Sequence, residues 1–254
     1  LDFETTVSTS ADQVAISPGY LVKSWEKDGR RYFHYKMDKQ ILPFFSYQSG
    51  RWEVKKADWR GVPIEVYHDK KHAYNIDSMV KGTQRALDYF SENFGPYQHK
   101  QVRITEFPLY QPYARSFPNT IPFSESLGFI NDMRNPDGVD HVFYVTAHEI
   151  AHQWWGDQVI AANVQGNPMI TESLAEYSAL MTLEKEYGAE KNRHILRWDL
   201  DKYFAGRAKE LVEEQPLFRD EGQDYIHYRK GSLVFYRLRE EMGEAALNGA
   251  LKRF

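Results

Sequence analysis

Alternating apolar and polar positions dominate the first 70 residues, starting with Phe3, Thr5 and Val7. A strand shows this period because successive side chains point to opposite faces of a sheet. Two pairs of such runs flank turn sequences: residues 21–26 and 31–37 around Asp28-Gly29, and residues 52–55 and 62–67 around residues 58–61. Asp-Gly is a strong hairpin signal because type I′ turns require positive φ angles. The pattern predicts β structure over residues 1–70.

The period becomes helical near residue 73. Apolar residues recur three or four positions apart up to Phe94, and Gly95-Pro96 supplies a stop, so we expect a helix over residues 74–94. A β-type run at residues 101–107 is followed by a long irregular segment, residues 110–126, of the kind that is usually functional or disordered. The run at residues 127–130 is expected to form a strand.

The rest of the chain is expected to be mostly helical. A helix over residues 139–155 contains no proline, and a second begins at Asn167-Pro168, where Asn is a favoured N-cap and Pro a favoured first residue, and ends at Gly188. Further helices are expected at residues 189–210 and 224–242. Strands followed by helices predict an α+β fold, with a β domain over residues 1–70 and a mostly helical domain over residues 71–254.

Composition narrows the class of protein. The 254 residues, 42% of them hydrophobic, can fill a sizeable core. A net charge of −4, from 32 basic and 36 acidic residues, gives no electrostatic reason to expect nucleic acid or an anionic membrane as a partner. No run approaches 18 apolar residues, and no cysteine is present, so a metal site must use histidine and carboxylate.

Both ends of the sequence resemble cut ends. The chain begins on Leu1, already within an alternating pattern, and it closes on an amphipathic pattern from Leu247 to Phe254 without a helix stop signal. We therefore expect a piece of a longer protein.

The strongest chemical signal is His148-Glu149-x-x-His152 on the helix expected at residues 139–155. Two histidines four residues apart lie on one helix face, one turn above each other, which is the separation that a single metal ion needs. A catalytic zinc takes three protein ligands and leaves a fourth position for water, beside which Glu149 would act as general base. The alternative is a chance pattern on an amphipathic helix.

The next helix carries two acids one turn apart, Glu172 and Glu176. A ligand from this helix would complete a His-His-Glu set of the kind that lowers the pKa of zinc-bound water to about 7. The alternative is that both are surface charges.

Other candidate residues have less specific signals. Tyr228 could donate its phenolic proton to an oxyanion, or it could be a packed aromatic residue. Glu125 could bind substrate or be a solvated loop carboxylate. The remaining histidines that we considered are expected to be structural, solvated or outside the ligand set: His34, His68, His72, His194 and His227.

Three motifs together resemble the zinc aminopeptidase family that includes aminopeptidase N and the leukotriene hydrolase. They are His148-Glu149-x-x-His152-Gln153-Trp154-Trp155-Gly156, then residues 171–177 (Thr-Glu-Ser-Leu-Ala-Glu-Tyr), then Tyr228-Arg229-Lys230-Gly231. The likeness covers nearly the whole chain. Residues 1–70 resemble the end of that family's β saddle, and residues 71–254 resemble most of its thermolysin-like catalytic domain.

The resemblance implies a role for each matching residue. His148, His152 and Glu172 would hold one zinc ion, Zn2+, per chain, with Glu149 as general base and Tyr228 as oxyanion donor. Glu176 would accept a hydrogen bond from a ligating histidine. The family's Gly-Ala-Met-Glu-Asn loop, which grips the substrate's free amine, corresponds to residues 122–126 and leaves Glu125 as its glutamate.

The sequence departs from the family at three places. Nineteen residues separate His152 from Glu172 where the family usually has 18, so the connection after Gly156 is expected to absorb one more. Only Glu125 is kept from the amine-recognition loop. The acid of the family's Tyr-Glu-Lys-Gly motif is Arg229 here.

The sequence thus predicts a zinc metallopeptidase that removes N-terminal residues from peptides. The alternatives are a thermolysin-like endopeptidase and a non-catalytic binding domain that has kept its zinc site. Similar domains occur fused to membrane permease-like segments, so the chain is compatible with a larger membrane-anchored protein, although it contains no such segment itself. The compartment stays open.

Overall fold

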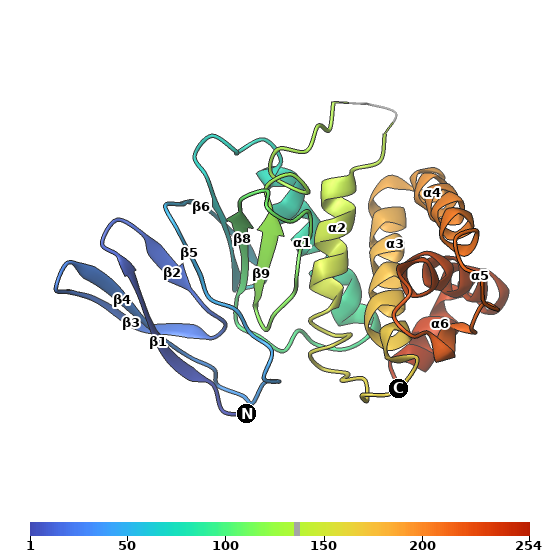
Figure 1. Cartoon of the computed structure of the whole chain (residues 1–254), viewed down its shortest axis with the longest axis horizontal. Helices are drawn as coiled ribbons and strands as arrows, with labels where there is room; N and C mark the ends of the chain where they lie inside the picture. Colours follow the sequence, from blue (N-terminus) through green and yellow to red (C-terminus); the bar gives the residue numbers. More distant parts are fainter. Residues whose placement is uncertain (135–137) are drawn as a thin grey trace. The chain divides into compact units, whose positions relative to one another are not determined.

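The computed structural model describes residues 1–134 and 138–254 (Figure 1). Contacts divide the chain into two compact units: residues 1–80 with 99–132, and residues 81–98 with 133–254. The first unit holds the sheets and the second most of the helices, which confirms the predicted α+β class. The division at residue 70 stays a prediction. Every helix in the described part of the chain is too short or too polar to span a lipid bilayer.

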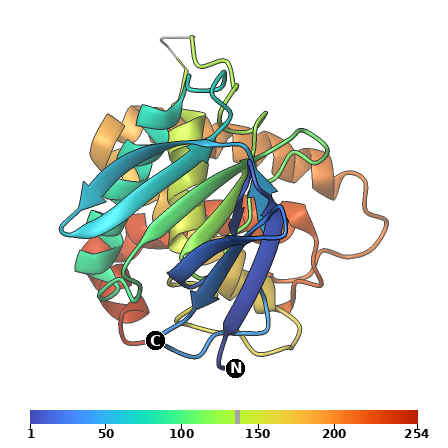
Figure 2. The same cartoon turned by 90° about the vertical axis from the view of Figure 1, so that its left-hand side faces the viewer.

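The first unit contains three sheets. Their strands are β1 (Glu4–Ser10), β2 (Val14–Ile16), β3 (Tyr20–Lys27), β4 (Arg30–Lys36), β5 (Gln48–Gly50), β6 (Glu53–Trp59), β7 (Val62–His68), β8 (Val102–Phe107) and β9 (Thr120–Ser124). The strand orders are β1-β4-β3, β2-β5 and β6-β7-β8-β9. In Figure 2 the long strands β6 and β7 (cyan) lie beside β8 and β9 (green).

Both predicted hairpins are confirmed. β3 pairs antiparallel with β4 through Asp28 and Gly29, whose φ angles are 51° and 70°. β6 pairs antiparallel with β7 through Arg60 and Gly61, whose φ angles are 50° and 86°. Positive φ at both central positions is the requirement of a type I′ turn, so local turn chemistry sets the pairing next to each turn. In the β3–β4 hairpin the register shifts farther from the turn, between Leu21 and Lys23.

The segment after β8 differs from the expectation. β9 lies within residues 110–126, which were expected to be irregular, and it pairs in parallel with β8. The strand expected at residues 127–130 is wrong, because these residues form turns in which Gly128 N donates to Ser124 O and Ile130 N to Glu125 O. The apolar run reflects burial of Phe129, which is 0% exposed and packs edge-on against Phe123.

A buried guanidinium ties the sheets of the first unit together. Arg103, on β8, is 3% exposed, and one of its terminal nitrogens donates to Ser17 O at 2.7 Å and to Gly19 O at 2.6 Å. It also lies within 3.2 Å of the Asn119 side-chain oxygen. Carbonyl groups buried at this position have no water to replace a lost donor.

The second unit is built from helices and helical turns. They are the end of α1 (Ile76–Asn93), α2 (His141–Ala151), the π-helix η1 (Met169–Ser173), α3 (Leu174–Tyr187), α4 (Ala189–Arg207), the 3-10 turn η2 (Leu217–Arg219), the π-helix η3 (Tyr225–Lys230), α5 (Gly231–Met242) and α6 (Glu244–Leu251). Each helix expected from the sequence is present.

The helix starts are only partly as predicted. Asp140 caps α2, since its side chain accepts from Phe143 N at 2.8 Å. The helix predicted from Asn167-Pro168 does start there, since both residues are helical and lead into the π-helix η1. η1 has no side-chain cap hydrogen bond, and the Asn167 amide donates instead to Ala162 O at 2.7 Å.

We predict that Arg103→Met destabilises the chain by about 2–4 kcal/mol, because several buried carbonyl oxygens lose a charged donor at once. The exposed Arg30 of β4 donates to Ser8 and is the matched control. Arg30→Met is expected to cost under about 1 kcal/mol. Urea unfolding followed by circular dichroism measures both, and equal losses would contradict the role given to Arg103.

Candidate metal centre and active site

Helix α2 presents two histidines on one face. His148 lies in its last turn, and His152 is the C-cap residue with right-handed helical φ and ψ. Their Nε2 atoms are 3.1 Å apart, and the Nδ1 atom of His152 lies 3.1 Å from Trp155 O. That bond requires a proton on Nδ1 of His152, so its Nε2 is left with a free lone pair in the neutral ring.

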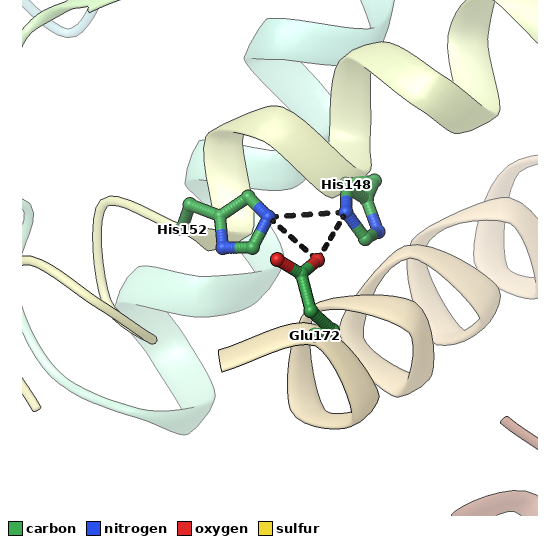
Figure 3. A group of neighbouring side chains, drawn as sticks. All are labelled: His148, His152 and Glu172. Carbon is green, nitrogen blue, oxygen red and sulfur yellow. Dashed lines mark hydrogen bonds and ion pairs between the residues drawn. The ribbon is translucent and has the colours of Figure 1, made fainter. Parts of the chain in front are cut away.

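The π-helix η1 supplies a carboxylate to the same point (Figure 3). The Oε2 atom of Glu172 lies 3.4 Å from His148 Nε2 and 3.3 Å from His152 Nε2. A π-helix closes i→i+5 hydrogen bonds, one residue more than an α-turn. The π-helix η1 can therefore accommodate the additional residue between His152 and Glu172. That residue was expected to lie in the connection after Gly156.

The three side chains fit a zinc ion. Ligands held about 2.0–2.1 Å from one tetrahedral zinc lie about 3.3 Å from one another, and the three pairs of ligand atoms here are separated by 3.1–3.4 Å. The Oε2 atom of Glu172 is buried and accepts no hydrogen bond. Two imidazole nitrogens and one carboxylate oxygen are also the donor set of hydrolytic zinc sites.

Electrostatics at this point favour a cation. Burial raises the pKa of Glu172, but His152 and His148 hold it well below its usual range, so the carboxylate stays ionised. Burial lowers the pKa of His152, but Glu172 and Glu149 outweigh it and raise that pKa to about 9. The same negative field that attracts a proton to His152 attracts a dication that replaces the proton.

Two candidate catalytic groups share the environment of these ligands. Glu149 is 6% exposed on α2. The ring of Tyr228, on η3, lies 6.0 Å from that of His148. Burial, the charge of Glu172 and a hydrogen bond with Glu172 raise the pKa of the Tyr228 hydroxyl, and Glu149 adds to the shift. The phenol therefore stays protonated and can donate.

Close packing brings η3 against η1. Ser173 Oγ donates to His227 O at 2.7 Å, which joins the neighbour of Glu172 to the neighbour of Tyr228. A Cβ added at Gly231 would lie 2.2 Å from Ser173 Oγ, so the glycine permits this approach. The Tyr228-x-x-Gly231 motif thus carries a steric requirement as well as a chemical one.

Glu176 lies one turn beyond Glu172, on α3. Its Oε1 atom is 3.4 Å from His148 Nδ1, and its Oε2 atom accepts a hydrogen bond from the Tyr144 hydroxyl. The contact to His148 is longer than a good hydrogen bond, although it is on the side of the ring opposite to Glu172. Glu176 thus lies beside His148, the histidine from which it was expected to accept a hydrogen bond, and its orienting role stays a prediction.

Glu125 belongs to the first unit, just after β9. Its Oε1 atom accepts from Leu109 N at 2.9 Å, and its Oε2 atom lies 3.8 Å from His72 Nδ1. The same His72 nitrogen lies 2.5 Å from Glu106, which is 5% exposed and also accepts from Asp69 N. These three residues could hold a cation, but both oxygens of Glu106 are already bonded.

The spacing of residues along the chain gave no indication of the cluster formed by His72, Glu106 and Glu125. His72 was expected to be solvated or structural, and its raised pKa results from the hydrogen bond to Glu106, which comes from a strand more than thirty residues later in the sequence. His227 was likewise expected to lie outside the ligand set, and its Nδ1 atom bonds Asp220 Oδ2 at 2.8 Å. Parallel strand pairing and helix packing bring these partners together.

Comparison with known proteins defines the family. A model of the Peptidase family M1 domain matches residues 78–254, which is more than half of the chain. The chain therefore belongs to peptidase family M1.

Individual relatives are distant and longer. The probable aminopeptidase 1 of Sulfurisphaera tokodaii is 25% identical over 173 residues, covering 65% of this chain and 22% of that protein. Aminopeptidase N of Lactobacillus helveticus is 24% identical over 256 residues, covering 90% of this chain and 28% of that protein. The chain thus spans about a quarter of the length of these two relatives.

Solved structures share the fold. The crystal structure of an M1 zinc metallopeptidase from Deinococcus radiodurans matches with a TM-score of 0.74 at 20% identity, covering 99% of this chain and 55% of that chain.

We predict about one zinc ion per purified chain, measured by inductively coupled plasma mass spectrometry. His152→Ala should abolish zinc binding because it removes one of three ligands, whereas Glu149→Ala should keep the metal. The exposed His194 of α4 is the matched control, and His194→Ala should retain full occupancy. Stoichiometric zinc in the His152 variant would refute the ligand assignment.

We predict that Glu176→Gln weakens zinc binding by about 10–100-fold, as loss of a partner that orients a ligating histidine does. Glu172→Gln should weaken it further because a ligand is lost. Competition with a chromophoric chelator measures both affinities. A larger loss of zinc affinity in the Glu176 variant than in the Glu172 variant would instead make Glu176 the ligand and Glu172 the orienting partner.

Proposed function

We propose that the chain is the zinc-binding part of a metallopeptidase that acts as an aminopeptidase. The observation that carries the proposal is the convergence of His148, His152 and Glu172 to within 3.4 Å of one another, beside Glu149 and Tyr228. Membership of the M1 family and the names of its relatives support the same reaction and peptides as its substrates.

Each side chain has one task in this reaction. A zinc ion held by the three ligands would lower the pKa of a bound water to about 7 and polarise the scissile carbonyl. Glu149 takes the proton from the attacking water and returns it to the leaving amine. Tyr228 donates a hydrogen bond to the carbonyl oxygen as negative charge develops there, which stabilises the transition state more than the substrate.

Glu149 and Tyr228 favour an enzyme over a binding domain. A site that only holds metal needs neither a general base nor a phenolic donor next to the ligands. In the proposed enzyme Tyr228 lies close enough to Glu172 and Glu149 that, after burial, their charges raise the pKa of its hydroxyl. The non-catalytic alternative therefore leaves a buried carboxylate and a partly buried phenol without a use.

The proposed architecture follows the family resemblance. Residues 1–70 would be the end of a β saddle, and residues 71–254 most of a thermolysin-like catalytic domain. The chain spans about a quarter of two M1 relatives, so the complete enzyme would be larger, and attachment to a membrane through other segments is compatible with this.

Glu125 is the proposed basis of exopeptidase specificity. A free α-amino group has a pKa of about 7.7–8.0 and is mostly cationic near pH 7. A fixed carboxylate can select for this cation. Leu109 N donates to the Oε1 atom of Glu125, so Oε2 is the oxygen that would bind the amine. Cleavage of chain ends would then depend on this residue, whereas a thermolysin-like endopeptidase would be indifferent to it.

We predict that Glu125→Ala lowers kcat/KM on peptides with free N-termini by about ten- to a hundredfold, since a charge-assisted hydrogen bond of roughly 1.5–3 kcal/mol is lost. Zinc content should stay unchanged. The exposed Glu53 of β6 is the control, and Glu53→Ala should leave kcat/KM unaltered. The intact parent protein is assayed on free and N-acetylated peptides; equal cleavage of both, insensitive to Glu125, would establish the endopeptidase.

A further inference from the structure

Acidic residues elsewhere in the second unit hold the side chains around Tyr228 on η3. Four neighbours of this tyrosine have such a partner, in the pairs Tyr225–Glu210, His227–Asp220, Arg229–Asp199 and Lys230–Glu214. One of these four residues, Arg229, stands at a position where the motif of the family that the sequence resembles has an acid. The two pairs next to Tyr228 differ from the outer two because their acids are completely buried, at 0% exposure.

The first inner pair fixes the C-terminal side of Tyr228. Arg229 donates to Asp199 Oδ1 at 3.0 Å, and Ser232 Oγ lies 2.6 Å from Asp199 Oδ2. The guanidinium also lies over the ring of Trp198, 4.3 Å from its centroid. One carboxylate on α4 therefore binds residues on both sides of the junction between η3 and α5.

The second inner pair fixes the N-terminal side. Asp220 Oδ2 bonds the His227 ring at 2.8 Å, while its Oδ1 accepts from Gln223 N at 3.0 Å and from Gly222 N at 3.2 Å. The His227 carbonyl in turn accepts from Ser173, the neighbour of Glu172. The backbone on either side of Tyr228 is thus held through a different buried carboxylate.

The arrangement suits orientation more than stability. Placing an acid in a buried ion pair costs desolvation that roughly cancels the attraction, so such pairs contribute little net stability. They do fix geometry, and a catalytic donor must be held within about 0.5 Å of its productive position. A tyrosine has only two rotatable side-chain bonds, so the backbone position of Tyr228 largely determines where its hydroxyl lies.

We propose that Asp199 and Asp220 are positioning residues, which hold the Tyr228 hydroxyl at the candidate zinc site through Arg229 and His227. This inference rests on the proposed function of Tyr228. It explains the change from the family motif, because Asp199 supplies from α4 the acid to which Arg229 binds. Neither aspartate touches the reacting atoms in this arrangement.

A double-mutant cycle tests the proposal in the intact parent protein. Asp199→Asn should lower kcat by about tenfold or more, as misplacement of a catalytic group does, with KM and zinc content unchanged. In the Tyr228→Phe background the same substitution should have almost no further effect, because the group that it positions is gone. Asp220→Asn and Arg229→Gln should behave in the same way, and they replace Asp199→Asn if that variant does not fold.

A second readout does not depend on activity. Ring spectra of protein labelled with 13C-tyrosine contain a Tyr228 signal that the Tyr228→Phe spectrum identifies. Asp199→Asn should shift or broaden this signal in both the zinc-free and the zinc-loaded protein. The control is Glu184→Gln, which changes a partly buried acid of this unit that bonds Tyr236 and Arg239. It should move the Tyr236 signal and leave that of Tyr228 in place.

The outcomes separate this inference from the proposed function. An unchanged kcat in Tyr228→Phe would remove the tyrosine from the mechanism, and the spectra alone would then decide whether the aspartates position it. A fall of equal size in both backgrounds, or loss of zinc from Asp199→Asn, would overturn the positioning role. An unshifted Tyr228 signal in all three variants would overturn it as well.

Discussion

The candidate metal centre depends on one geometric constraint: three potential ligand atoms from two separate segments must meet at tetrahedral spacing inside the protein. Two of them come from the end of α2 and the third from η1, with nineteen residues in between. Packing of α2 on α3 holds the segments together, and buried hydrogen bonds reinforce it, such as that from the Trp155 indole to Ser178 Oγ at 2.9 Å. Small displacements of either helix would separate the ligands.

This constraint also concentrates negative charge. Glu149 and Glu172 together raise the pKa of His152 to about 9, and burial together with Glu176 raises the pKa of Asp199 to about 7. Buried carboxylates are costly unless cations or hydrogen-bond donors compensate them. Each is compensated differently here, Glu176 by the Tyr144 hydroxyl and Asp199 by Arg229 and Ser232. Glu172 has His148 and His152 beside it, where a dication would complete the balance.

In the first unit, local and distant interactions have separate effects. The hairpins could be predicted because Asp28-Gly29 and Arg60-Gly61 encode their own turns. β9 could not, since its parallel partner β8 is joined to it by an irregular connection and contributes hydrogen bonds that no local pattern records. The run at residues 127–130 has the composition of a strand, but it forms turns in which Phe129 is buried against Phe123.

At the candidate site, the sequence by itself determined only the features that arise within a single helix. The helical period brings His148 and His152 to one face with Glu149 beside them, whatever the rest of the fold. The choice between Glu172 and Glu176 lies beyond that period, since residues four apart share a face, and it depends on the π-helix and on how α3 packs against α2. The partners of Arg229 and His72 lie about thirty residues away along the chain, and only the tertiary structure could identify them. Such pairings arise from packing between elements, which the order of residues within any one element does not specify.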